Sequence, residues 1–269
     1  MADLVLLDIA DGVAVVTLNR PEVRNALSRQ VLAELHQAVG EADRRHDVAV
    51  VVLTGADPAF CAGLDLKEVG ADGGPLRTVV DAAADARGAG GLLPTGKPLI
   101  GAVNGVAVTG GLELALRCDF LVASERARFA DTHARVGVQP LWGLTALLPQ
   151  AVGLRRAREM SATGNFVDAA AALAWGLVNH VVPHQELLPF TLRLAADVVS
   201  NDQRALATLW STYDQGSRTT VGDALAIETE RGLVWQHQVL DFAEVERRRR
   251  QVVDRGRASQ PPVPTTDTP

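Results

Sequence analysis

Continuous apolar runs are the feature that most constrains the fold of this chain. Residues 48–53 and 98–103 are apolar at nearly every position, with no polar alternation. A strand of this kind has both faces covered, so each run predicts a buried strand of an α/β domain. Asp11-Gly12, between apolar residues 4–9 and 13–18, is a strong signal for a hairpin. We therefore expect the first half of the chain to hold a sheet.

The second half of the chain has a different pattern. After Pro140, apolar residues recur at helical spacing in most segments between residues 144 and 235, and a strand-like run at 177–182 interrupts them. The glycine-rich segment 70–91 is expected to be in part a mobile loop with a helix inside it. The tail at 259–269 reads SQPPVPTTDTP and is expected to be disordered.

Charge and cysteine content exclude several classes of function. The chain has 32 acidic and 26 basic residues and a net charge of −6, so no overall field favours nucleic acid or a membrane surface. Its two cysteines do not form a disulfide framework and indicate a reducing compartment. The amino terminus has no signal-peptide pattern, and no apolar run reaches membrane-spanning length, so we expect a cytoplasmic protein.

Three local motifs resemble binding sites but depart from the residue patterns that those sites require. Residues 91–97 nearly spell a phosphate-binding loop, but Pro98 stands where Ser or Thr is required, so we interpret them as a turn. His180 and His184 are separated by a proline and are not expected to share a helix face for a metal. The arginine run at 247–250 has glutamates beside it, which favours a solvated helix face over an anion site.

The sequence VTGGLELAL at residues 108–116 places a glutamate just after two glycines. Gly110 and Gly111 lie at a predicted strand-to-helix junction, where the first helical amides have no partner and can hold an oxyanion. Glu113 falls in the first turn of the helix. It either complements the helix dipole or serves in proton transfer, and this stretch alone supports both interpretations.

A second loop of the same kind occurs at residues 58–66, PAFCAGLDL. It follows the predicted buried strand 48–53 and again carries small residues at a loop-to-helix step. Two such loops together can present two backbone amides to one carbonyl oxygen, which stabilises an enolate without a metal.

Four motifs identify a family resemblance. They are TLNRPEVRNAL at 17–27, AFCAGLDL at 59–66, KPLIGAVNGVAVTGGLELAL at 97–116 and GLVNHVVP at 176–183. In this order they resemble the crotonase superfamily, the enoyl-CoA hydratase/isomerase family, and the resemblance covers residues 4 to about 257.

The resemblance implies an α/β fold, a crotonase-like spiral of ββα units with a helical C-terminal oligomerisation region. On this basis we expect the spiral core over residues 1–200, a helical trimerisation region over 201–258 and the tail over 259–269. The family packs as homotrimers, often as a dimer of trimers. Its substrates are acyl-CoA thioesters, with no cofactor beyond the coenzyme A of the substrate.

Site residues carry over by position in the motifs. The amides of Leu64 and Gly110 match the oxyanion hole, and Glu113 matches one catalytic glutamate. Positions that match contacts to CoA or substrate are Val23, Arg24, Ala26, Ala62, Asp65, Leu66, Gly111, Thr132, Gly137 and Trp142. Arg24 either pairs with a CoA phosphate or is an ordinary surface arginine. Trp142 and Leu144 either wall the acyl pocket or belong to the core.

The chain departs from the hydratase pattern at the second catalytic glutamate. In FADTHARVG at residues 129–137 that position holds His133. Histidine accepts and donates protons near neutral pH, so it is a feasible replacement. Asp131 shares a face with position 133 in a strand but not in a helical turn, and we place His133 ahead of it as the second site group. A structural histidine near the pocket is the other interpretation.

Four functions remain after this departure. The leading one is hydration of the 2,3 double bond of an enoyl-CoA, with Glu113 and His133 as the catalytic pair. The second is an isomerase that moves the double bond with one proton shuttle. The third is another crotonase-type reaction, such as hydrolysis or carbon–carbon cleavage of an acyl-CoA. The fourth is a non-catalytic acyl-CoA-binding homologue.

Overall fold

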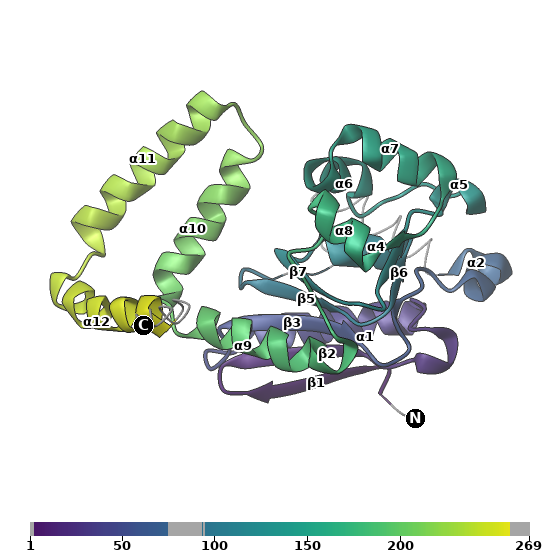
Figure 1. Cartoon of the computed structure of the whole chain (residues 1–269), viewed down its shortest axis with the longest axis horizontal. Helices are drawn as coiled ribbons and strands as arrows, with labels where there is room; N and C mark the ends of the chain where they lie inside the picture. The colour runs from purple at the N-terminus through teal and green to yellow at the C-terminus, as the bar shows by residue number, and fades with distance from the viewer. Residues whose placement is uncertain (1–2, 75–92, 94, 259–269) are drawn as a thin grey trace, which may run out of the picture. The chain divides into compact units, whose positions relative to one another are not determined.

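The computed structural model describes residues 3–74, 93 and 95–258 (Figure 1). The chain divides into two compact units, Met1–Ala207 and Thr208–Pro269. Residues 75–91 of the predicted loop and the predicted tail at 259–269 lie outside the described residues. Within the described part, no helix combines the length and the apolar composition needed to cross a bilayer.

A six-stranded sheet forms the base of the first unit, in the order β1-β2-β3-β5-β7-β10. Its strands are β1 (Val5–Ala10), β2 (Val13–Leu18), β3 (Val50–Gly55), β5 (Leu99–Val103), β7 (Phe120–Ser124) and β10 (His180–Val182). The β1–β2 pair is antiparallel and all other pairs are parallel. Asp11 and Gly12 have φ of 51° and 81°. These left-handed conformations confirm the predicted tight hairpin.

A second sheet of four short strands has the order β4-β6-β8-β9. Its strands are β4 (Ala59–Cys61), β6 (Val106–Val108), β8 (Arg128–Ala130) and β9 (Val167–Asp168). Along the chain a strand of the first sheet is followed by a strand of the second and then by a helix. The helices are α2 (Leu66–Asp72), α4 (Gly110–Leu116) and α5 (His133–Val136). This threefold ββα repetition confirms the predicted fold class.

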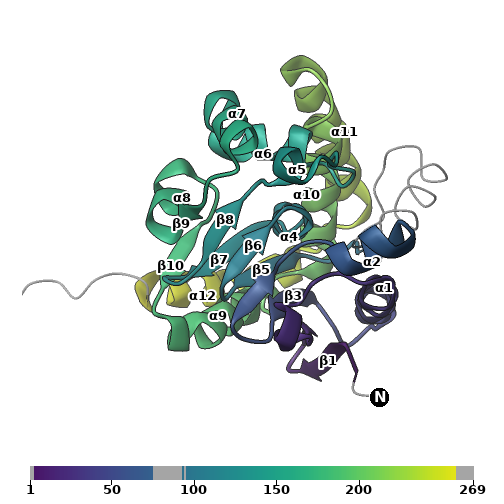
Figure 2. The same ribbon diagram turned by 90° about the vertical axis from the view of Figure 1, so that its right-hand side faces the viewer.

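The apolar strands are buried because helices cover both faces of the first sheet. All six positions of β3 are buried. Val51 and Leu53 pack in one core cluster with α1 (Arg29–Arg44), whereas Val50 and Val52 pack in another with α9 (Leu187–Val199). Figure 2 shows α1 and α9 on opposite sides of β3. The continuous apolar run in the sequence therefore reflects two separate cores.

The remaining helices follow the segments with helical spacing. In the first unit they are α6 (Leu144–Val152), α7 (Leu154–Thr163), α8 (Ala169–Trp175) and the short 3-10 turns η1 (Pro21–Val23) and η2 (His184–Glu186). Helix α10 (Gln203–Gly216) spans the division between the units, and α11 (Val221–Gln238) and α12 (Phe242–Ala258) complete the second unit. The arginines of α12 pair along the helix surface, Arg248 with Glu244 at 2.6 Å and Arg249 with Glu246 at 2.8 Å.

Two of the rejected motifs have structural partners instead of ligands. The Lys97 ammonium group donates hydrogen bonds to the carbonyls of Ala42 at 2.8 Å and Arg45 at 2.5 Å. The ammonium group therefore binds the carboxyl end of α1, which agrees with the interpretation of residues 91–97 as a turn and not a phosphate-binding loop. The ring of His184 lies between the hydroxyl of Ser124 and the carboxylate of Asp57, at 3.0 Å from each.

A buried asparagine fixes the loop that precedes α1. Asn25 is fully buried, and its φ of 56° lies in the left-handed region. Its amide nitrogen donates to the carbonyls of Ala56 and Ala59 at 2.8 and 2.7 Å, and its side-chain oxygen accepts from the Arg20 amide at 2.9 Å. One side chain therefore ties the loop at residues 23–26 to the turn between β3 and β4.

Replacing Asn25 with alanine is expected to destabilise the protein by about 2–4 kcal/mol, because several buried polar groups lose their partners together. Urea unfolding at fixed protein concentration measures this change. The control Gln30→Ala removes an exposed side chain and is expected to stay within about 0.5 kcal/mol of the parent. Equal midpoints for the two variants would show that Asn25 does not hold the loop.

Candidate active site

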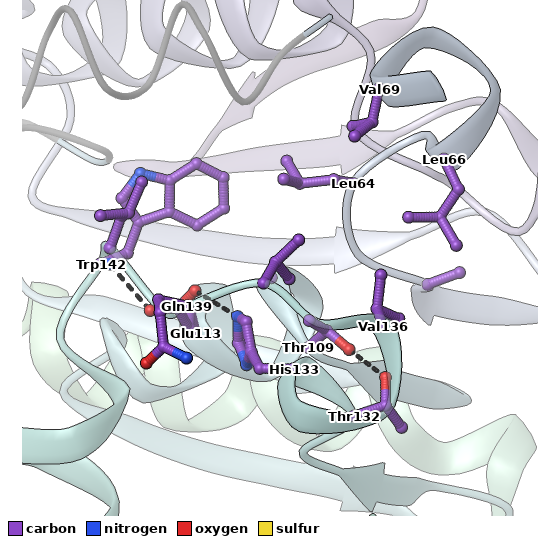
Figure 3. A pocket seen from close by; sticks show the side chains of 14 residues that line it. Leu64, Leu66, Val69, Thr109, Glu113, Thr132, His133, Val136, Gln139 and Trp142 are labelled. Carbon is purple, nitrogen blue, oxygen red and sulfur yellow. Dashed lines mark hydrogen bonds and ion pairs between the residues drawn. The ribbon is translucent and has the colours of Figure 1, made fainter. Parts of the chain in front are cut away.

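A pocket in the first unit brings most of the predicted site residues together (Figure 3). Of the residues predicted from the sequence, it is lined by Ala62, Leu64, Leu66, Gly110, Glu113, Thr132, His133 and Trp142. Sequence analysis did not predict six further lining residues, which are Val69, Thr109, Val136, Val138, Gln139 and Leu141. Apart from Thr109 and Gln139 these are apolar, and a lining aliphatic residue has the same sequence pattern as a core residue.

The two glycine-containing loops touch through their backbones. Gly63 has φ of +88°, and a methyl group placed on it would lie 2.8 Å from the Val108 carbonyl and 3.2 Å from the Gly110 nitrogen. The Leu64 and Gly110 amides therefore lie on adjoining segments. Within the part of the chain that the structure describes, neither amide donates a hydrogen bond to the protein. Both residues line the same pocket.

The residue before Gly110 holds an unusual backbone conformation. Thr109 has φ of 55° and ψ of −113°, a region that residues with a side chain rarely adopt. Its hydroxyl lies 2.5 Å from the hydroxyl of Thr132, the residue before α5 (Figure 3). This contact joins the junction of β6 and α4 to the start of α5, so the two segments that carry the polar site groups are fixed to each other.

Glu113 is buried, with 3% of its surface exposed, but its carboxylate is not in an apolar environment. One oxygen, Oε1, accepts hydrogen bonds from the amides of Trp142 at 2.8 Å and Leu144 at 3.4 Å. The other, Oε2, lies 3.3 Å from Nε2 of His133. Figure 3 shows the carboxylate between Trp142 and His133. Glu113 therefore has polar partners in the structure, although its neighbours in the sequence are apolar.

His133 lies between two carboxylates. Its Nε2 faces Glu113, and its Nδ1 lies 2.6 Å from Oδ1 of Asp131, which also accepts from the His133 amide at 3.1 Å. Burial alone would lower the pKa of His133, but the hydrogen bonds and charges of Asp131 and Glu113 outweigh it and raise the pKa to about 9. The sequence sets Asp131 and His133 as alternatives, whereas in the structure they are hydrogen-bonded partners.

Trp142 forms one wall of the pocket. A methyl group placed on Gly110 would lie 3.0 Å from the Trp142 ring, so the indole packs over the start of α4. Leu144 is buried in the main core cluster and is not among the lining residues. Trp142 therefore belongs to both the pocket wall and the core cluster, whereas Leu144 belongs to the core cluster and does not line the pocket.

The predicted CoA-contacting residues lie on two adjoining segments. The Arg24 carbonyl accepts a hydrogen bond from the Ala62 amide at 3.0 Å, which places the loop at residues 23–26 beside the segment 62–66. The Arg24 side chain is exposed. Val23 and Ala26, on either side of it, are half-buried and do not line the pocket.

Three other predicted contact residues have structural partners away from the pocket lining. Asp65 caps α2 and pairs with Arg20 at 2.7 Å. Burial raises the pKa of Asp65, but the hydrogen bond from Arg20 and those from the start of α2 outweigh it and lower the pKa overall. Gly111 packs on Cys61, whose carbonyl a methyl group would approach to 2.1 Å. Gly137 ends α5 with φ of 84°.

The chain matches the family described as Enoyl-CoA hydratase/isomerase over residues 8–243. A probable peroxisomal enoyl-CoA hydratase 1 of Arabidopsis thaliana is 40% identical over 220 residues, which are 82% of this chain and 82% of the relative. A short-chain-enoyl-CoA hydratase of Clostridium acetobutylicum is 36% identical over 84% of this chain and 87% of its own length.

Solved structures agree with these sequence matches. An enoyl-CoA hydratase from Mycobacterium smegmatis has a TM-score of 0.72 and 45% identity, and the match covers 88% of this chain and all of that one. An enoyl-CoA hydratase from Bacillus anthracis has a TM-score of 0.83 and 31% identity, with 92% and 96% coverage.

Cysteine chemistry is not expected at this site, although Cys61 lies directly beneath it. Burial raises the pKa of Cys61 to about 12 and raises that of Cys118 as well. Cys61 is buried, whereas Cys118 is partly exposed. At pH 8 Cys61 of the native protein is therefore expected to react with a thiol reagent at least tenfold more slowly than in denaturant. Rapid labelling of Cys61 in the folded protein would contradict its burial.

Proposed function

Because this chain belongs to the enoyl-CoA hydratase/isomerase family, we propose that it adds water across the 2,3 double bond of an enoyl-CoA thioester. The observation that carries the proposal is the juxtaposition, in one pocket, of a buried pair of proton-transfer groups with two backbone amides that have no partner among the described residues. The amides of Leu64 and Gly110 stabilise the negative charge that develops on the thioester oxygen. Glu113 and His133 handle the protons on the same side of the pocket.

The proposed reaction starts with water held at Glu113. The carboxylate takes a proton from water, and the hydroxide oxygen bonds to C3 of the substrate. The electrons of the double bond move onto the thioester oxygen, which the two amides hold as an enolate. The enolate then takes a proton at C2. Hydrogen bonds from the Trp142 and Leu144 amides hold the Glu113 side chain in position, with Oε2 directed to His133.

The CoA part of the substrate is proposed to lie outside the pocket, along the adjoining segments at residues 23–26 and 62–66. Ala62 and Leu66 line the pocket, and the exposed Arg24 is proposed to bind a phosphate of CoA. Asp65 contributes indirectly, since it caps α2 and holds Arg20. Gly111, Thr132 and Gly137 shape the surrounding backbone. No cofactor beyond the CoA of the substrate enters the proposal, and the two free cysteines suit a reducing cytoplasm.

The second unit is proposed to assemble the protein as a homotrimer or a dimer of trimers. Its helices leave large apolar side chains exposed on a single chain, among them Tyr213 at 72%, Leu225 at 59% and Phe242 at 78%. Helix α11 buries none of its residues within the chain. Exposed apolar surface of this extent is typical of an interface between subunits.

The proposed activity predicts conversion of crotonyl-CoA to a product heavier by one water. Glu113→Gln and His133→Ala are each expected to lower kcat by about 10²- to 10⁴-fold, because each removes a proton-transfer group. Mass spectrometry of the thioester follows the reaction. Exposed residues of the same types give matched controls, Glu159→Gln and His36→Ala, which are expected to retain activity.

The same assay with a 3-enoyl-CoA separates the alternatives. Conversion of the 3-enoyl to the 2-enoyl thioester without uptake of water would identify an isomerase, for which the single Glu113–His133 contact at 3.3 Å serves as the proton shuttle. Tight binding of acyl-CoA with no conversion of either substrate would identify a binding protein. Either outcome would overturn the hydratase proposal.

The proposed assembly predicts a mass in solution of three or six chains by light scattering. Leu225→Asp places a charge on the exposed apolar surface of α11 and is expected to lower that mass while the far-UV spectrum stays unchanged. Glu228→Gln, an exposed change on the same helix, is the control. A parent protein that runs as a monomer would contradict the proposal.

A further inference from the structure

The Asp131 carboxylate lies behind the imidazole of His133, on the side away from Glu113. Its Oδ1 is 2.6 Å from the ring Nδ1, and Glu113 Oε2 is 3.3 Å from the ring Nε2. Asp131 and His133 are buried, with 3% and 6% exposed, so water does not screen the contact. The result is a line of three titratable groups, of which the proposed reaction uses only two.

The chemistry of the ring follows from this contact. A carboxylate accepts hydrogen bonds, so Nδ1 must carry a proton, and the remaining nitrogen that can exchange a proton is Nε2. Two carboxylates, one at each nitrogen, favour the doubly protonated ring. Burial opposes this charge, but hydrogen bonds to the two carboxylates raise the pKa of His133 to about 9. The Asp131 pKa is raised by burial but lowered further by hydrogen bonds from His133 and Ser161.

The other elements packed around His133 do not offset these charges. Helix α7 packs against α5, and from it the neutral hydroxyl of Ser161 reaches Asp131. Arg135, on the same short helix as His133, is directed to the carbonyl of Thr163 at 2.9 Å. Helix α4 contributes Glu113. Among the described residues, the charges that act on the ring are therefore the two carboxylates.

We infer that Asp131 is a positioning residue that holds His133 as an imidazolium with its Nε2 proton facing Glu113. This inference rests on the proposed function and assigns separate acid and base roles to its two proton-transfer groups. His133 is the acid that gives its Nε2 proton to C2 of the enolate, and Glu113 is the base that takes a proton from water. A glutamate at position 133 would have to be protonated beforehand to do this, whereas the imidazolium carries its proton at neutral pH.

The two groups can also restore each other after each turnover. At that point Glu113 holds the proton from water and His133 is neutral at Nε2. Since Oε2 and Nε2 are 3.3 Å apart, the proton passes from Glu113 to His133 and the ion pair re-forms. The net change is the addition of a hydroxyl group at C3 and a hydrogen at C2, with no proton gained or lost by the enzyme.

Asp131 also makes a bond that a merely structural residue would make. Its Oδ1 accepts a hydrogen bond from the His133 amide at 3.1 Å, and this bond closes the turn that starts α5. Asparagine supplies the same acceptor without the charge. Asp131→Asn therefore separates the two roles, because it keeps the turn and removes the negative group behind the ring.

The deciding measurement is the titration of His133 by NMR in the substrate-free protein, with ¹³C at Cε1 of histidine. His133→Ala identifies the signal among the six histidines. The parent is expected to titrate near pH 9. In Asp131→Asn the midpoint is expected to fall by about one to three pH units. This readout needs no activity, so it remains decisive even if the protein fails to hydrate any enoyl-CoA.

Kinetics give a second readout. An acid must hold its proton, so kcat of the parent is expected to fall as pH rises through about 9. With Asp131→Asn this fall moves to lower pH. For a midpoint near 7, about a tenth of the molecules carry the proton at pH 8, and kcat there drops roughly tenfold while KM stays nearly constant.

Asp168→Asn is the matched control for this substitution. Asp168 caps α8 through the Ala171 amide at 2.8 Å and is exposed, so the same exchange there is expected to leave both the titration and the pH profile unchanged. The inference is overturned if none of the six histidine signals of the parent titrates near pH 9, an outcome that requires no variant to fold. It is also overturned if Asp131→Asn leaves the midpoint near 9.

Discussion

Direct packing of backbone on backbone holds the pocket together. Gly111, at the start of α4, lies so close to the Cys61 carbonyl of β4 that a methyl group would approach it to 2.1 Å. Gly63 meets the Val108 carbonyl in the same way at 2.8 Å. Any side chain at these two glycines would separate the second sheet from the helix that carries Glu113. The positions of the Leu64 and Gly110 amides and of the buried carboxylate depend on this close approach.

A chain of polar contacts continues from that junction. The hydroxyl pair of Thr109 and Thr132 joins the start of α4 to the start of α5, and the line from Glu113 through His133 to Asp131 runs beside it. Buried polar groups are costly unless each has a partner, so such a network either fixes one arrangement or destabilises the fold. Here the carboxylates and the ring are paired, which fixes the direction of the ring within a mostly apolar pocket.

The sequence predicted the fold well where burial leaves a pattern. The strands at 48–53 and 98–103 and the helix at 144–152 appear close to their expected positions, because covered faces require apolar residues at regular intervals. Strands β4 and β9 have three and two residues, too few for periodicity to show.

Within the site, sequence reasoning found the side chains and missed how they are joined. The glycine-containing stretch at residues 108–116 already indicates Glu113, and the resemblance indicates His133. The amides of Trp142 and Leu144 that hold Glu113 carry no sequence signal, since every residue except proline has an amide. The pairing of Asp131 with His133 had a signal, an aspartate two residues before a histidine at a helix start. Spacing alone does not establish this pairing, because residues two apart share a face in a strand but not in a helical turn.

The amide of Trp142 and its indole ring have separate tasks in this structure. The amide anchors Glu113, whereas the ring covers Gly110 and forms the pocket wall. Mutation can change the ring but cannot remove the amide, except by introducing proline. For the proposed reaction, selection can therefore remodel the acyl-binding wall at this position over evolutionary time without loosening the base. Substrate preference can diverge among descendants of this scaffold while the proton chemistry is inherited unchanged.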